Sequence, residues 1–158
     1  MARTGADLAL LLLGGFRALA DAASVELARR GHDDVRPSHD FAMRAIAAGA
    51  DNASALGRSL AVTKQAAAKT IAVLEERGYV ARADDPADAR RRLVQVTPLG
   101  HQVMREGEAI FDALREDWAR QIGQAELTQI EASLIALVGA RPINLDAPGG
   151  VIEDIGEA

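Results

Sequence analysis

The stretch LGRSLAVTKQAAAKTIAVLEERGYVAR, residues 56–82, decides the fold because it contains two helical patterns that meet at a short turn. Asn52 is a favourable N-cap for a first helix over residues 53–60, and Thr63 is a favourable N-cap for a second. Ala67, Ile71 and Leu74 give the second helix a buried side, and Gly78 ends it. Two helices joined by about three residues predict a helix-turn-helix.

The next segment, RADDPADARRRLVQVT at residues 82–97, predicts a charged hairpin. Residues 79–83 and 91–96 are rich in β-branched or aromatic side chains, and the Asp- and Pro-containing segment 84–88 favours a turn between them. A hairpin that follows a helix-turn-helix is a wing, and its basic tip suits a nucleic-acid groove.

Long amphipathic helices flank this module. Apolar residues at steps of three and four predict a helix over residues 4–30 and a shorter one that begins at Pro37 and ends at Gly49. Two further helices are expected after Thr97, separated at Gly123. We therefore predict a mainly α fold with a small β-hairpin wing, a winged module over residues 36–97, a helical lobe from 1–35 and 98–139, and a flexible tail over 140–158.

Composition narrows the chemistry. The 158 residues include no cysteine, which excludes disulfides and thiol chemistry, and aromatic residues make up only 3%, which favours helix packing. His32, His39 and His101 lie in separate elements, without metal-ligand spacing, a phosphate-binding glycine loop or a nucleophile motif nearby. We expect no enzyme activity, no metal and no cofactor.

The N-terminus superficially resembles a signal peptide, with an apolar run over residues 8–13 after Arg3. Asp7 and Arg17 interrupt that pattern, and the helical spacing of the apolar residues favours an amphipathic helix. No continuous run approaches the ~18 apolar residues of a membrane span. We expect a soluble, cytoplasmic protein that does not bind membranes.

The net charge of −5 conceals a basic segment. Residues 58–97 hold eight Arg and Lys against five Asp and Glu, which gives +3 there and leaves −8 for the remainder. Such asymmetry indicates a local phosphate-binding surface on an acidic body. An ordinary solvated mixture of charges is the alternative interpretation.

These segments resemble the MarR family of winged helix-turn-helix transcription regulators. The resemblance lies in residues 56–82, which end in the family's LE-x-x-G-hydrophobic-V-x-R pattern, and in DPADARRRLVQVTPLG, residues 85–100. Residues 52–100 carry it specifically, and the helix order extends it more weakly to about residues 10–139. The chain departs from the family at Ala61, where glycine is frequent, at Ala55, where a capping Glu is frequent, and at Ala66–Ala68.

The resemblance implies a homodimer in which the N- and C-terminal helices interleave as a dimerisation lobe. The helix that follows Thr63 would enter the major groove of double-stranded DNA with an inverted-repeat site, and the wing would lie along the minor groove. Arg90 would be the wing-tip arginine, with Asp88 as its orienting carboxylate. We expect a sequence-specific transcriptional regulator that acts as a repressor.

The DNA-contacting residues follow from this arrangement. Gln can pair with adenine, Lys can reach guanine or phosphate, and an arginine held by a carboxylate loses little freedom on entering a narrow groove. The candidates are Thr63, Lys64, Gln65, Ala68, Lys69, Asp88, Arg90, Arg91 and Arg92. A solvated helix face and an ordinary surface ion pair between Asp88 and Arg90 are the alternatives.

Two further interpretations concern what the protein binds besides DNA, or in place of it. The resemblance implies a small aromatic or phenolic effector bound between the winged module and the dimerisation lobe, with candidate walls at Phe16, His39, Phe41, Met43 and Trp118; each of these also suits a core or surface position. A winged-helix adapter that binds proteins without specific DNA binding is the alternative function. An adapter would not need the basic tip Arg90–Arg92.

Overall fold

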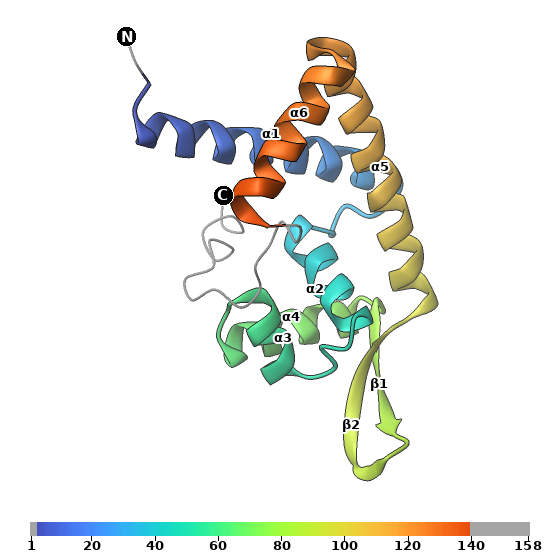
Figure 1. The fold of residues 1–158 in the computed structure, drawn as a ribbon. Coiled ribbons are helices and arrows are strands. Elements are labelled where there is room, and N and C mark those ends of the chain that lie inside the picture. Colours follow the sequence, from blue (N-terminus) through green and yellow to red (C-terminus); the bar gives the residue numbers. More distant parts are fainter. Residues whose placement is uncertain (1–2, 140–158) are drawn as a thin grey trace.

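The computed structural model describes residues 3–139, which form six α-helices and one antiparallel hairpin (Figure 1). The elements are α1 (Gly5–Arg29), α2 (Pro37–Ala47), α3 (Ala53–Leu60), α4 (Lys64–Glu76), β1 (Val80–Asp85), β2 (Asp88–Val96), α5 (Pro98–Ile122) and α6 (Gln124–Val138). The mainly α class with a hairpin wing is confirmed. The tail expected over residues 140–158 lies outside the described residues.

Local capping sets the helix boundaries. The side chains of Thr4, Asn52, Thr63 and Thr97 each accept a hydrogen bond from a backbone amide of the first helical turn that follows. Gly78 has a φ of +78°, a conformation that ends α4 without the steric cost a side chain would bring. The strands extend closer to the tip than the sequence predicted, because pairing continues beyond Ala83↔Leu93 to Asp85↔Asp88.

The core lies in the winged module and in the adjoining ends of the long helices. Met43, Leu56, Ile71 and Leu74 are fully buried there, and the second half of α1 joins them with Ala23 and Leu27. Helix α5 runs from the base of the wing to the far end of the molecule, where α6 turns back beside it (Figure 1). It starts in close contact with Tyr79, the residue before β1, since a Cβ at Gly100 would collide with the Tyr79 carbonyl oxygen.

Helix α1 is more apolar over its length than the search for continuous apolar runs indicated. Its length, and a mean hydropathy of 1.6 over its most apolar 18-residue window, are sufficient for a membrane-spanning helix, and only 11% of that window is buried within the chain. The sequence estimate counted continuous apolar runs, whereas a window average tolerates an isolated charge such as Arg17. Length and composition therefore do not separate a membrane helix from a helix covered by another protein.

Helices α1 and α6 both expose large apolar side chains. Leu8, Leu10, Leu11 and Leu12 on α1 have exposed fractions of 49–66%, and Leu137 on α6 reaches 81%. Ile130, Ile135 and Val138 on α6 are also exposed. Arg115 and Glu131 join α5 to α6 through two hydrogen bonds of 2.6 and 2.8 Å, so the α5–α6 hairpin is held although little of α6 is buried. We call these exposed residues of the two helices the α1/α6 apolar surface.

Candidate nucleic-acid interface

The turn between α3 and α4 brings the two helices into close contact. Gly57 lies beneath it, because a Cβ there would be 3.0 Å from the Val62 carbonyl oxygen. Ala61 occupies the left-handed region, with φ +54° and ψ +37°, at the position where the family often has glycine. This conformation costs an alanine roughly 1–2 kcal/mol. Alanine in place of glycine therefore keeps the turn but lowers the stability of the fold.

The first two turns of α4 present a polar outer face. Thr63 accepts a hydrogen bond of 3.0 Å from the Ala66 amide, so its hydroxyl acts mainly as the cap. The remaining four predicted helix residues are exposed: Lys64, Gln65, Ala68 and Lys69. Of the neighbouring alanines, Ala67 is fully buried, which explains the small side chain at that position by helix packing.

The wing tip is organised by backbone hydrogen bonds. The Asp85 carboxylate accepts from the Ala87 amide at 2.8 Å, and the Asp88 carboxylate accepts from the Arg90 amide at 3.0 Å. Asp88 therefore holds the backbone of Arg90, whereas the sequence predicted that it would orient the guanidinium. Within residues 3–139, the Arg90 side chain forms no ion pair.

The three wing arginines differ in their partners. Arg92 lies 3.5 Å from Asp84 across the strands, and both side chains are largely exposed. Arg91 instead reaches back to the start of α3, where its Nη2 is 3.2 Å from Asp51 Oδ1. Arg91 thus serves as an anchor of the wing, while Arg90 extends from it without a charged partner.

Asp51 is a functional candidate that the sequence did not reveal. Its carboxylate accepts from Arg91, and its backbone carbonyl accepts from the Val94 amide at 2.8 Å. These two contacts tie β2 to the residue before the Asn52 cap. No spacing rule links positions forty residues apart, so only the folded structure identifies the pair.

Some basic residues of the segment 58–97 form ion pairs with acidic residues, and others do not. Arg77 pairs with Asp34 at 3.2 Å and Arg82 with Glu75 at 3.2 Å, which neutralises both. In the described chain, four cations of this segment have no such partner: Arg58, Lys64, Lys69 and Arg90. Arg58 is exposed on α3 and was not among the predicted site residues.

The structure brings together some of the five predicted effector residues and buries others in the core. Met43 is fully buried in the core, whereas the rings of Phe16 and Phe41 have centroids 6.5 Å apart. Trp118 lies against α1, 3.6 Å from the position of a Cβ at Gly15. Burial, together with the nearby Arg77 and Arg36, lowers the pKa of His39.

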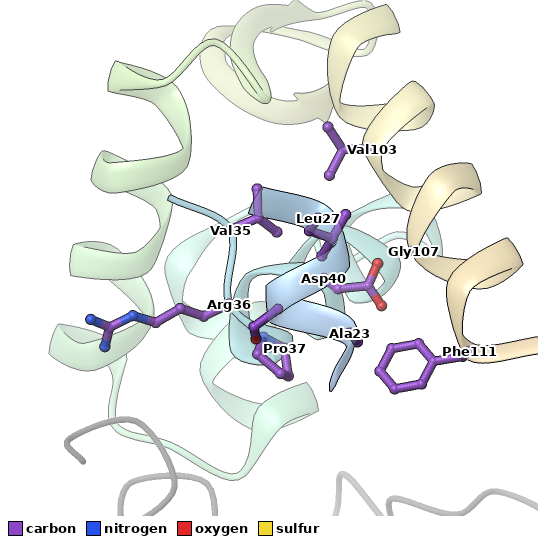
Figure 2. Close-up of a pocket in the computed structure, with 10 residues that line it drawn as sticks. Ala23, Leu27, Val35, Arg36, Pro37, Asp40, Val103, Gly107 and Phe111 are labelled. Atoms are coloured by element: carbon purple, nitrogen blue, oxygen red, sulfur yellow. The ribbon is translucent and has the colours of Figure 1, made fainter. Parts of the chain in front are cut away.

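A pocket lies nearby, between α1, α2 and α5 (Figure 2). Its walls are formed by other residues than those five, including Leu27, Val35, Asp40, Val103 and Phe111. The predicted junction between the helical lobe and the winged module therefore does contain a cavity. The sequence did not indicate which side chains line this pocket. Helical periodicity identifies the buried side of a helix, but it does not show where packed helices leave a cavity between them.

The Asp51 anchor generates a prediction about the wing. Asp51→Ala should accelerate hydrogen exchange of the wing amides by up to about fivefold, because a partly exposed ion pair contributes up to about 1 kcal/mol. Mass-spectrometric exchange on peptides that cover residues 80–96 measures this. Asp84→Ala, which removes the exposed partner of Arg92, is the matched control and should have a smaller effect. Equal exchange in the two variants would contradict the anchoring role.

Comparison with known proteins agrees with this geometry. Residues 41–91 match the model of the MarR family. The chain is 36% identical over 64 residues to the transcriptional regulator HosA of Escherichia coli O111:H-, an alignment that covers 40% of this chain and spans only about half (47%) of that relative.

Solved structures share the fold over most of the described chain. CouR from Rhodococcus jostii RHA1, solved with p-coumaroyl-CoA, has a TM-score of 0.62 at 21% identity and covers 87% of this chain and 96% of its own. FabT from Streptococcus pneumoniae, solved with DNA, has a TM-score of 0.68 at 20% identity, with coverages of 82% and 92%. Residues 41–91 of this chain therefore resemble the MarR family, and the chain shares the fold of the solved MarR-family regulators.

Proposed function

We propose that this protein is a sequence-specific DNA-binding transcriptional regulator that acts as a homodimer. The observation that carries the proposal is the position of the unpaired cations. Lys64 and Lys69 lie on the outer face of α4, and Arg90 lies at the wing tip. Both elements lie at the end of the molecule opposite to α6 (Figure 1). A helix and a projecting hairpin at one end suit the major groove and the neighbouring minor groove of one duplex.

The exposed residues of α4 suit direct contact with base pairs. Gln65 carries a donor and an acceptor that match the major-groove edge of adenine, and Ala68 is small enough to approach a thymine methyl group. Lys64 and Lys69 supply charge for phosphates or guanine. The buried Ala67 keeps α4 close to α3, so α4 can reach the groove with the two helices as one unit.

The α1/α6 apolar surface supports the dimer. Burying a leucine side chain contributes about 1.5–3 kcal/mol, and four exposed leucines follow one another closely on α1. A second copy of the chain would cover this surface with an equivalent one and would hold two winged modules side by side. The two α4 helices would then meet half-sites of an inverted repeat roughly one helical turn apart.

We further propose that the regulator represses transcription and that a small aromatic ligand releases it. A dimer on a site that overlaps a promoter excludes other proteins from that site. The cavity between α1, α2 and α5 lies where the helical lobe joins the winged module, so an occupant would act on both. The fold neighbour CouR was solved with p-coumaroyl-CoA, which supports a ligand-responsive regulator on this fold.

Selection of bound duplexes from a random pool tests the proposed function. We expect an inverted repeat whose half-sites are about one helical turn apart, because two identical modules related by a two-fold axis read the same sequence on opposite strands. A pool that stays unenriched after repeated rounds would instead favour the protein-interaction adapter. The bound fraction should be measured at several salt concentrations, since non-specific binding falls steeply with salt.

Arg90 is the residue whose loss should weaken DNA binding most clearly. Arg90→Ala should raise the Kd for the selected duplex more than about tenfold, since a groove-inserted arginine contributes about 1–3 kcal/mol. Gel-shift titration measures the change. Arg120→Ala removes the same charge near the end of α5 and serves as the control, with binding unchanged. Equal Kd values for the Arg90→Ala variant and the unmodified protein would contradict the assignment of Arg90 as a DNA contact.

A further inference from the structure

The pocket between α1, α2 and α5 has an apolar wall and one charged member. Ala23 and Leu27 come from α1, Val35 and Pro37 from the segment that enters α2, and Val103 and Phe111 from α5. The enclosed space is about 10 Å³, which is room for about one water molecule or for the head group of a ligand. The half-buried ring of Phe111 lies beside Gly107 on α5 in Figure 2.

Asp40 is the charged member, and half of its carboxylate lacks a partner. The residue is only 6% exposed. Its Oδ2 accepts a hydrogen bond of 2.7 Å from Arg44 Nε, whereas its Oδ1 has no hydrogen-bond partner among the described residues. A buried acceptor left unpaired costs about 1–3 kcal/mol, and more when it is charged. A donor that reaches Oδ1 would therefore form a hydrogen bond that removes this cost.

The surroundings of Oδ1 favour a positive group. Glu108 adds a further negative charge near Asp40, and burial raises the pKa of the Asp40 carboxyl. Arg44 is already engaged with Oδ2 and donates to the Met104 carbonyl oxygen at 3.4 Å. Arg36 also borders the pocket, but its side chain extends away from Asp40 in Figure 2. A carboxylate or phenolate placed against Oδ1 would be repelled.

Gly107 leaves the approach to this oxygen open. It lies on α5 opposite Asp40, and a Cβ at this position would be 3.6 Å from Oδ1. A side chain of even one carbon would therefore occupy the space that a ligand head group needs. The glycine and the unpaired carboxylate oxygen come from different helices and define the same small volume.

We propose that this pocket binds a protonated primary amine with a small aromatic or apolar body, its ammonium group donating to Asp40 Oδ1. An ammonium group is close to a water molecule in size and fits the enclosed space, while the body of the ligand lies toward Phe111. The assignment rests on the proposed function in that this amine is the ligand that releases DNA. It keeps the aromatic character of the effector that the family resemblance implied, and it specifies a positive charge.

Binding here would act on both elements that hold the winged module. Asp40 is on α2, which packs against α3, and Gly107 is on α5, which begins at the base of the wing. The body of the ligand is larger than the enclosed space of about 10 Å³, so an occupant pushes α2 away from α5. Such a displacement changes the position of the wing relative to α4, and that is how the ligand weakens DNA binding.

The test uses benzylamine as the cationic probe and benzoate as an anion of similar size, titrated calorimetrically into the full-length protein at pH 7. We expect benzylamine to bind at least tenfold more tightly than benzoate, and Asp40→Asn to weaken benzylamine at least tenfold. Benzoate binding as tightly as benzylamine, benzylamine binding unaffected by Asp40→Asn, or no benzylamine binding at all would each overturn the proposal. The last result would leave the cavity as the site of a water molecule.

Gly107→Ala tests the same site without changing a charge. Its Cβ makes an ordinary contact with Asp40, so the fold should tolerate it even where Asp40→Asn does not fold. We expect at least a tenfold loss of benzylamine affinity, and unchanged affinity would contradict the proposed position of the ammonium group. Asp112→Asn removes an exposed acid from the same helix and should leave benzylamine binding unchanged.

Gel shifts on the selected duplex separate this proposal from the proposed function. DNA binding that is insensitive to benzylamine, in a protein that binds the amine, would overturn the effector role and leave DNA regulation standing. Amine binding that depends on Asp40, in a protein that selects no DNA, would contradict the proposed function and leave the amine site standing. Release of DNA by benzylamine from the unmodified protein, but not from the Gly107→Ala variant, is the result that both proposals require.

Discussion

The apolar face of α1 is the constraint on which the rest of the molecule depends. Four leucines of its first half are 49–66% exposed, while its second half joins the core through Ala23 and Leu27. One chain cannot bury such a helix, because α5 and α6 leave its first half uncovered and α6 exposes apolar residues of its own. In the proposed homodimer, a second copy of the chain would supply the missing cover. The same cover would fix the distance between two winged modules through α5.

Specific polar contacts connect the helical lobe to the end of the molecule that carries α4 and the wing. Asp34, in the loop between α1 and α2, pairs with Arg77 and accepts from the Tyr79 hydroxyl at 3.0 Å, which ties the loop to the end of α4. Burial and the hydrogen bond to Asp34 raise the pKa of Tyr79 to about 12. Asp51 holds the wing through Arg91 in a similar way. The outer faces of α4 and the wing are thereby left with the cations that have no internal partner.

The sequence predicted the elements well because their limits depend on local chemistry. Caps at Asn52, Thr63 and Thr97 and the stop at Gly78 act within one turn of the backbone, so the helices and the helix-turn-helix followed from spacing. Contacts between residues far apart in the sequence could not be predicted from spacing. Nothing local distinguishes Arg91, which anchors the wing, from Arg90, which has no charged partner, and nothing local indicates that the pocket is formed around Asp40 instead of the predicted aromatic residues.

In the proposed homodimer, a second copy of the chain covers the α1/α6 apolar surface. Sedimentation equilibrium in detergent-free buffer at micromolar concentration tests it most directly. We predict a mass of twice 16.7 kDa, and substitution of Leu11 by Glu, which places a charge on the covered face, should shift the protein toward the single-chain mass. A mass of 16.7 kDa for the unmodified protein, at concentrations that saturate its selected DNA, would contradict the account.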